Sequence, residues 1–321
     1  MLEAKVWFAA LSQCLFSLNT GFGPLIMLGS YNRFDRNIYR DTWIASGIDT
    51  LTSLLAGLTI FAFLGNLAWT MDVDILKVAL TENHFAIIIF AQAVSMFEVV
   101  PQLFCIIFFL MMAIIGVGTA TAYVGAVITV IASLFPKSSR YRVPLIVCFI
   151  GLIIGLMYLT PGGSMMTRLA DYFGAKVVIC IMALVEVVGV AWIYGIDNFL
   201  VDIEFMLKLK LGLYWKLSWC YFIPTFLSGI LVYAFLDGQH SPGYKGHSFS
   251  NITLSAGWLY SLLAISAIPI FAFYVVKTSK GTGWQEKFKE AMKPSEEWGP
   301  KRCDLRQDWL EYKKHRLDNE C

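Results

Sequence analysis

The sequence predicts an all-helical (all-α) integral membrane protein, and its composition and hydropathy support this class. Of its 321 residues, 57% are hydrophobic and 15% are charged, whereas a soluble globular domain carries roughly 25% charged residues. The mean hydropathy is +0.64, and the apolar residues gather in runs of about 20 residues, the length a helix needs to cross a bilayer. The net charge is only +2, which gives no indication of a nucleic-acid partner. A lipid bilayer is the expected environment.

Membrane spans can be assigned from these runs, and the remaining residues form a C-terminal tail. The tail, 277–321, is rich in Lys, Glu, Asp and Trp. Within it Trp284, Phe288 and Met292 recur at helical spacing, which predicts a short amphipathic helix. An apolar patch at 85–97 is too short to cross, which favours a re-entrant or surface helix. The seven predicted spans, which make residues 1–276 a transmembrane region, are approximately 7–32, 43–69, 101–135, 143–160, 175–199, 214–236 and 254–276.

The positive charges of the short loops predict how these spans are oriented. Lys and Arg gather in the loops 33–42, 136–142 and 200–213 and in the tail, while the opposite loops are poorer in them. Since cytoplasmic loops carry the excess of Lys and Arg, we expect the tail in the cytoplasm and the N-terminus outside. An outside N-terminus with so few residues before the first span is hard to insert. We therefore expect further spans upstream that this sequence lacks.

The first span is interrupted at its centre by Asn19-Thr20-Gly21-Phe22-Gly23-Pro24. Proline lacks a backbone N–H and glycine favours turns, so this run ends a helix. Non-helical backbone at membrane depth is tolerated only where it is buried in protein or lines an aqueous cavity. Freed carbonyls can hold a cation, and the half-helix after the break can hold an anionic group at its N-terminus. The break alone leaves a binding site and a kinked structural helix equally open.

Successive segments of the chain resemble the neurotransmitter:sodium symporter family. The resemblance covers essentially the whole chain in order and identifies the seven spans as the sixth to twelfth of twelve. It implies the second inverted repeat and the two peripheral spans of a five-plus-five inverted-repeat transporter fold, with a broken first helix. The segments include SLNTGFGPLIMLGSYNRFDRNIYRD, DTLTSLLAGLTIFAFLG, FFLMMAIIGVGTATAYVGAVITVIASLFP, TPGGSMMTRLADYFG, ALVEVVGVAWIYGIDNF and WKLSWCYFIPTFLSG.

The resemblance implies a sodium-coupled symporter of amino acids or related small amines, and not an enzyme. It places the protein in the plasma membrane as a multi-pass protein with a cytoplasmic C-terminus. The family's first span, which forms the other half of the substrate site, is absent. We therefore expect that the chain alone does not transport. It is either a C-terminal fragment or a natural truncated isoform that acts as a regulatory or pairing subunit. Nutrient amino acid, neurotransmitter and osmolyte substrates all remain open.

Four polar side chains match the ion sites of the family. Gln13 and Ser17 match chloride-binding side chains, and Ser17 also matches a ligand of the first sodium ion. Without the resemblance, an interhelical hydrogen bond would be the favoured interpretation of Gln13. Asp49 and Ser53 lie one helical turn apart on one face and match two further positions, of which Asp49 serves both sodium and chloride. Relatives usually carry Asn in place of Asp49. An ionised carboxylate there repels chloride and strengthens cation binding, whereas a protonated one resembles the amide.

This departure leaves chloride dependence in doubt. A carboxylate inside a membrane is costly and is a functional candidate by default. We associate Asp at this position with the nutrient amino acid transporters of insects and related animals, so the chain is nearest to that branch.

The substrate site implied by the resemblance lies at the break. Phe16 and Phe22 match aromatic residues that line and cover the substrate, beside the unwound backbone at Gly21. The amide of Asn19 could help to select the substrate. Tyr123, further along the chain, faces the same pocket on this interpretation. Without the resemblance, the aromatic residues would be assigned to packing.

The third span carries the second sodium site of the family. Its segment IGVGTA supplies the backbone carbonyl of Ile115 and the hydroxyl of Thr119, which also borders the substrate pocket. Gly118 stands where an Asp or Thr is common, so one ligand is missing. Near the outer end of the fourth span, Asp171 matches the acidic half of an extracellular gate, although a solvated acid at a helix start would look the same.

Two other classes of membrane protein fit less well. A seven-span G-protein-coupled receptor shares the expected topology. The third span of such a receptor ends in a DRY-like motif, whereas the third span of this chain ends in SLFPKSSRYR. An intramembrane protease needs two facing Asp residues or a Ser–His pair. Only Asp49 lies deep in a span, and the four His residues lie in loops or the tail. A transporter is therefore the expected class.

Overall fold

A computed structural model of the chain describes most of the sequence, and the described residues form two compact units. Unit 1 comprises Met1–Phe22, Tyr31–Arg40 and Thr167–Cys321, and unit 2 comprises Gly23–Ser30 and Asp41–Met166. The described residues are 4–72, 74, 94, 100–135, 141–236, 243–244, 247–295 and 298–318.

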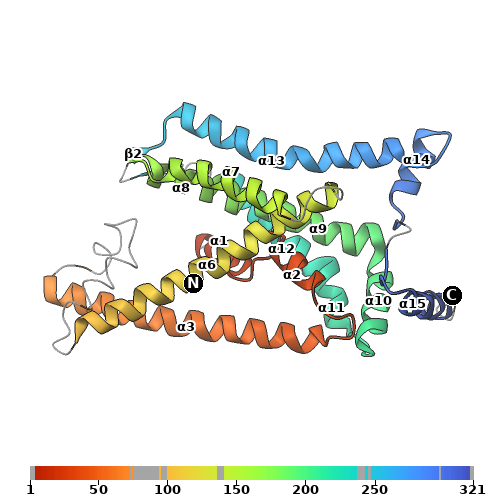
Figure 1. The fold of residues 1–321 in the computed structure, drawn as a ribbon, viewed down its shortest axis with the longest axis horizontal. Helices are drawn as coiled ribbons and strands as arrows, with labels where there is room; N and C mark the ends of the chain where they lie inside the picture. Colours follow the sequence, from red (N-terminus) through yellow and green to blue (C-terminus); the bar gives the residue numbers. More distant parts are fainter. Residues whose placement is uncertain are drawn as a thin grey trace. The chain divides into compact units, whose positions relative to one another are not determined.

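The regular secondary structure of the described residues is helical except for one pair of two-residue antiparallel strands, in which Tyr244 lies opposite His247 (Figure 1). Three of the helical segments, η1 to η3, are π-helical. In chain order the elements are α1 (Ala4–Ser17), α2 (Pro24–Ser30), α3 (Ile38–Met71), α6 (Pro101–Leu134), α7 (Arg142–Tyr158), α8 (Gly163–Ala170), η1 (Asp171–Val178), α9 (Ile179–Val188), η2 (Gly189–Gly195), α10 (Ile196–Leu207), α11 (Leu213–Leu217), η3 (Ser218–Phe222), α12 (Ile223–Leu236), β1 (Gly243–Tyr244), β2 (His247–Ser248), α13 (Asn251–Thr278), α14 (Trp284–Ala291) and α15 (Cys303–Asp318).

Several described helices are apolar enough to cross a membrane, in agreement with the predicted class of helical membrane protein. The run Gly163–Leu207, from α8 to α10, is continuous and begins well before the predicted span 175–199. Arg142–Tyr158 is a further apolar helix, but it is shorter. The predicted helix at 85–97 lies outside the described residues, apart from Val94. The four helices of spanning length are Ile38–Thr70, Pro101–Leu134, Gly163–Leu207 and Asn251–Thr278.

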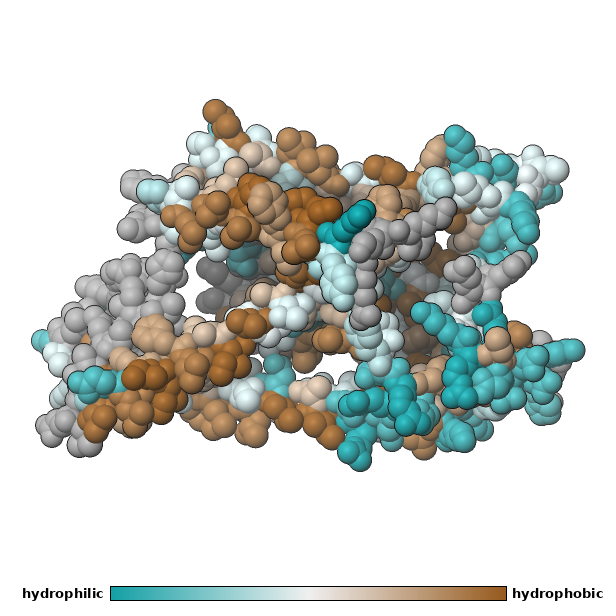
Figure 2. Space-filling view, in the orientation of Figure 1, coloured by the Kyte–Doolittle hydropathy of each residue, from teal (hydrophilic) through white to brown (hydrophobic). Residues whose placement is uncertain are grey.

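The tail differs from these helices in surface chemistry. Figure 2 shows hydrophilic residues over α14 and α15, and hydrophobic residues along α3. The predicted amphipathic helix is present as α14, Trp284–Ala291. Its first turn is held by the Glu286 carboxylate, which accepts hydrogen bonds from the backbone N–H and the hydroxyl of Thr282. These hydrogen bonds hold the pKa of Glu286 below its ordinary value. The second tail helix, α15, is not anticipated by the sequence analysis.

The core of unit 1 lies where α9 and α12 pack together. Cys180 and Ala183 of α9 meet Leu227 and Ile230 of α12, and all four side chains are buried. Leu15 of α1 packs against this cluster. Because the two α9 residues are small, neighbouring helices can approach α9 closely. Through Leu15, the half-helix α1 packs against the core of unit 1.

A second close contact in unit 1 joins α13 to the π-helical segment η1. The ring of Phe173 is 1% exposed and meets the Trp258 ring edge to face, with centroids 5.2 Å apart. A Cβ added at Gly257 would lie 2.3 Å from the Phe173 ring. The buried Ser261 hydroxyl donates a 2.9 Å hydrogen bond to the Phe173 carbonyl. A small residue on α13 and a π-helical backbone on its partner therefore bring the two helices into contact.

Unit 2 is built on α6, which contacts both α2 and α7. The Met27 side chain of α2 reaches toward Gly125 of α6, where an added Cβ would lie 3.0 Å from the Met27 Cε atom. No residue of α6 is buried within the described part of the chain. The half-helix α2 therefore belongs with α6, whereas α1 belongs with α9 and α12.

Candidate functional site

The predicted break in the first span is confirmed. Helix α1 ends at Ser17 and α2 begins at Pro24. Between them Asn19, Gly21 and Gly23 have φ angles of 53°, 76° and 92°. Such angles favour glycine and, after it, asparagine. The local residue types therefore account for the interruption.

The chain turns sharply after the last turn of α1. The Leu15 carbonyl accepts a 3.1 Å hydrogen bond from the Thr20 backbone N–H and a 3.3 Å hydrogen bond from the Thr20 hydroxyl. The Asn19 backbone N–H donates to the Phe16 carbonyl at 3.2 Å. These bonds close the end of the half-helix and orient the unwound residues that follow.

Gly21 brings the unwound segment close to α9. A Cβ at this position would lie 3.2 Å from the Ala183 Cβ and 3.3 Å from the Ile179 carbonyl oxygen. These distances leave almost no room for a side chain. Gly21 is therefore required both by its φ angle and by the neighbouring helix.

Two predicted substrate-binding residues meet across the break. The rings of Phe16 and Phe22 are 5.8 Å apart at an interplanar angle of 80°, an edge-to-face geometry. Phe16 is 50% exposed, and Ser17 and Asn19 are half-buried. Gln13, one turn before Ser17, is exposed. The break thus presents an aromatic pair next to polar side chains.

The other predicted ion ligands lie in unit 2. Asp49 and Ser53 are one turn apart on α3, with Asp49 half-buried and Ser53 exposed. Ile115, Thr119 and Tyr123 follow one another at four-residue spacing on α6 and share one face. Ile115 and Thr119 are exposed and Tyr123 is half-buried. Each set is arranged by a single helix of unit 2.

The predicted gate residue Asp171 lies in unit 1. It is the first residue of η1 and is exposed. The predicted site residues are therefore divided between the units, with those of the broken helix and the gate in unit 1 and those of α3 and α6 in unit 2.

A cluster that sequence analysis missed surrounds the Asp202 carboxylate of α10. Its Oδ1 accepts hydrogen bonds from Trp309 Nε1 at 2.9 Å and Lys313 Nζ at 3.1 Å. Its Oδ2 accepts from the Tyr194 hydroxyl and, at 3.4 Å, from Trp298 Nε1. Asp202 and Lys313 are each 16% exposed. Three of the four donors come from the tail, so the tail is held to α10 by a nearly buried charge.

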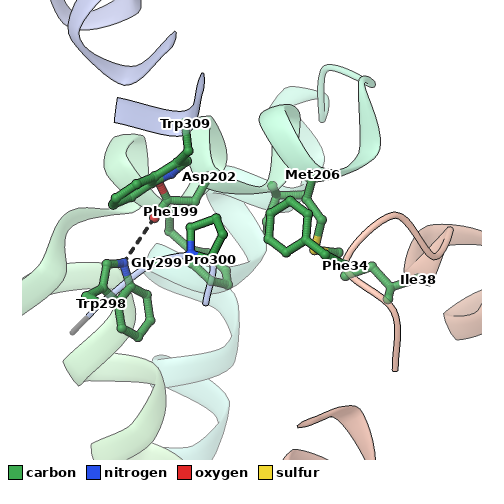
Figure 3. Close-up of a pocket in the computed structure, with 10 residues that line it drawn as sticks. Phe34, Ile38, Phe199, Asp202, Met206, Trp298, Gly299, Pro300 and Trp309 are labelled. Carbon is green, nitrogen blue, oxygen red and sulfur yellow. Dashed lines mark hydrogen bonds between the residues drawn. The ribbon is translucent and has the colours of Figure 1, made fainter. Parts of the chain in front are cut away.

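A cavity of about 390 Å³ lies beside this cluster. Figure 3 shows Trp298 and Trp309 near Asp202 and, across the cavity, Phe34 next to Met206. Asp202 contributes the one carboxylate of an otherwise apolar lining. The lining residues are Phe34, Ile38, Phe199, Asp202, Ile203, Met206, Trp298, Gly299, Pro300 and Trp309.

Comparison with known proteins identifies similar transporters. A profile described as “Sodium:neurotransmitter symporter family” matches residues 1–279. “Sodium-dependent nutrient amino acid transporter 1” of Drosophila erecta is 39% identical over 318 residues, which cover 98% of this chain and 49% of that protein. Proteins of the same description from Drosophila virilis and Drosophila melanogaster are 39% and 38% identical over 315 residues, with the same coverage. The chain thus spans about half the length of the curated relatives it matches.

Proposed function

Since the chain belongs to the sodium:neurotransmitter symporter family, we propose that it is the C-terminal half of a plasma-membrane symporter that couples amino acid uptake to sodium. The family consists of transporters, which sets aside the enzyme and receptor classes. The observation that carries the proposal is the match over residues 1–279, together with fly relatives described as nutrient amino acid transporters. Among the substrate classes, nutrient amino acids are favoured over neurotransmitters and osmolytes for the same reason.

In this proposal the chain supplies the sixth to twelfth spans, that is, the second inverted repeat and two peripheral spans. The transmembrane region is 1–276, and the tail 277–321 lies in the cytoplasm. The excess of Lys and Arg in the tail and in alternate loops supports this orientation. The preceding spans belong to the same native protein or to a partner subunit.

The substrate site of the proposal is centred on the break between α1 and α2. Backbone N–H and C=O groups that make no helical hydrogen bond can bind a small zwitterion. The edge-to-face pair Phe16 and Phe22 offers an apolar surface to its side chain, and Asn19 offers an amide. Thr119 and Tyr123 of α6 contribute the remaining polar contacts.

In this proposal the co-transported ions are bound by polar side chains near the break and in unit 2. Sodium is held at one site by Ser17 and Asp49, and at a second by the Ile115 carbonyl and Thr119, because hard cations prefer oxygen ligands. Chloride, where it binds, is held by Gln13, Ser17 and Ser53, and by Asp49 when its carboxyl group is protonated and resembles an amide. The exposed carboxylate of Asp171 serves as the acidic half of the outer gate.

The first test is the mass of the native protein, detected with an antibody against residues 277–321. We expect a band near twice the 36.1 kDa of this chain, and amino acid uptake into cells expressing that protein that is lost when choline replaces sodium. A band at the mass of this chain alone would contradict the half-transporter and would favour a pairing subunit. Uptake that persists without sodium would contradict the coupling.

Asp49→Asn is expected to strengthen chloride dependence. Removing the charge removes its repulsion of a nearby anion, and about 1.4 kcal/mol of repulsion corresponds to roughly tenfold in chloride affinity. Uptake by the whole protein is measured against chloride concentration, with gluconate as the replacement anion. Asp41→Asn, about two turns earlier on the same helix, is the matched control. An unchanged chloride response in Asp49→Asn would refute this role of the carboxylate.

A further inference from the structure

The C-terminal end of α13 is the place where an apolar helix of spanning length meets the polar tail. Lys277 is the one charged residue of this helix and lies in its last turn. Phe273 precedes Lys277 by four residues, which is roughly 6 Å along a helix, and it is more than half exposed. Because a lysine near the end of a span extends to the headgroups, Phe273 lies at the depth where α13 leaves the hydrocarbon region.

The next helix, α14, begins after a tight turn that takes the chain off the line of α13 (Figure 1). Gly281 in this turn has a φ angle of 156°, in a region that glycine adopts far more readily than other residues. An added Cβ would lie 3.1 Å from the Lys287 backbone nitrogen. The Glu286 carboxylate closes the turn by accepting hydrogen bonds from Thr282. The direction in which α14 leaves α13 is therefore fixed by the turn.

Two contacts hold the first half of α14 against the end of α13. The centroid of the Trp284 ring lies 5.8 Å from that of the Phe273 ring. The Lys287 Nζ atom donates a 3.4 Å hydrogen bond to the Lys277 carbonyl, which is one of the carbonyls that a helix leaves without a backbone partner at its C-terminus. Tryptophan is enriched at membrane–water interfaces. The contact with Phe273 therefore places Trp284 at the interface of the bilayer.

An apolar strip, formed by Trp284, Phe288 and Met292, continues along α14 from this point. Its members are 58%, 50% and 43% exposed, so the protein covers only about half of each side chain. Lys287 and Lys289 precede and follow Phe288, about 100° away on either side of the helix. An apolar strip bordered by lysines is typical of helices that lie in a membrane interface, because the lysine side chains extend to the headgroups.

The acidic side chains of α14 lie on the other side of the helix. Glu290 follows Phe288 by two residues, or about 200°, and its carboxylate accepts a 2.8 Å hydrogen bond from Lys293 Nζ. The Glu286 carboxylate is engaged by Thr282. The borders of the apolar strip are therefore positively charged. The surface of a cytoplasmic leaflet is negative because it carries anionic lipids, so the two surfaces are complementary.

We propose that α14 lies in the surface of the lipid leaflet from which the tail emerges. The apolar strip inserts among the lipids, and Lys287 and Lys289 contact anionic phospholipid headgroups. The occupant of this surface is lipid and not another protein, because the strip begins beside Phe273, within a spanning helix. The helix α14 thereby anchors the end of α13 and sets where the tail leaves the membrane. This inference requires only that α13 crosses a bilayer, and it does not rest on transport.

The first test is lipid photolabelling of the purified full chain. The protein is placed in nanodiscs of phosphatidylcholine and phosphatidylserine that contain a trace of phosphatidylcholine with a diazirine near the top of one acyl chain. After irradiation, peptide mass spectrometry identifies the labelled residues. We expect labels on the apolar strip of α14 and none on α15, whose surface is hydrophilic (Figure 2). Labelling of α14 that is no stronger than that of α15 would overturn the insertion.

The second test is backbone hydrogen–deuterium exchange of α14 in nanodiscs with and without phosphatidylserine. We expect exchange about tenfold slower in the anionic nanodiscs. Lys289→Gln, which removes one bordering charge, is expected to reduce this difference about fivefold. Equal exchange of the wild type in the two kinds of nanodisc would overturn the anionic partner.

A matched pair of variants tests the apolar strip in the same measurement. Phe288→Gln and Glu290→Gln place the same residue on opposite sides of α14, and both replace exposed side chains. Phe288→Gln is expected to speed exchange of α14 in both kinds of nanodisc, because it removes the centre of the strip. Glu290→Gln is expected to leave exchange no faster than in the wild type. Equal exchange in the two variants would show that the strip is not inserted.

Discussion

Gly257→Ala is expected to destabilise the protein by about 1–3 kcal/mol, the usual cost of overpacking a close contact. The new Cβ would lie 2.3 Å from the Phe173 ring. That ring is 1% exposed and is held between the rings of Tyr172 and Trp258, so it cannot swing aside. The helix α13 must then move away from η1, which also lengthens the buried hydrogen bond from Ser261 to the Phe173 carbonyl.

The measurement is thermal unfolding in detergent, followed by size-exclusion chromatography of the heated samples. Gly229→Ala on α12 is the matched control, because its Cβ meets no described atom within 4 Å. That control is expected to be neutral or to gain up to about 1 kcal/mol, since alanine is the better helix former. Phe173→Leu in the Gly257→Ala background should recover part of the loss. Equal melting temperatures for the two alanine variants would show that α13 and η1 are not closely packed.

If the proposed function holds, Gly21→Ala is expected to reduce sodium-dependent uptake by the whole protein tenfold or more, an effect of about 1.4 kcal/mol or greater. Its φ angle of 76° costs a residue with a Cβ roughly 1–2 kcal/mol. The same Cβ also meets Ala183 at 3.2 Å and the Ile179 carbonyl at 3.3 Å. Because α9 is part of the core of unit 1, the unwound segment must yield, and Phe16 and Phe22 move with it.

Gly23→Ala separates the two causes. Gly23 also has a positive φ angle, 92°, but an added Cβ meets nothing described within 4 Å. The Gly23→Ala variant is therefore destabilised only by its positive φ angle, without a steric clash. It is expected to retain more uptake than Gly21→Ala. Adding Ala183→Gly to Gly21→Ala removes the nearest obstacle and should restore part of the activity. Equal uptake in the two alanine variants, at equal surface expression, would rule out a role for the contact with α9.

The helical membrane class and the break at 18–23 could be predicted because both depend on neighbouring residues. Long apolar runs must satisfy their own backbone hydrogen bonds in lipid, so they form helices whatever surrounds them. The two glycines and Pro24 interrupt the helix through their own backbone geometry. The edge-to-face contact of Phe16 with Phe22 follows from the short turn between them. The family, too, could be recognised, because each of its motifs is a continuous stretch of sequence.

The docking of the tail could not be predicted, because its partners are far apart in the sequence. Asp202 meets Lys313, and Glu204 meets Arg316, more than a hundred residues away. Lys313 and Lys314 are adjacent residues of the same type, so the sequence does not distinguish them. They differ because Lys313 contacts α10 and Lys314 is exposed. Likewise, nothing in the residues of α13 indicates that Gly257 faces a buried ring.

The sequence by itself therefore determined that this chain is a helical membrane protein of a symporter family and that it has an interrupted helix. These properties come from the solvation of the backbone in lipid and from the φ preferences of single residues. Only the tertiary structure decided that α1 packs in one unit and α2 in the other, and that the tail docks on α10 through Asp202 and Glu204. Those arrangements depend on which distant side chains have the shape and charge to pack together, and this is settled only when the chain has folded.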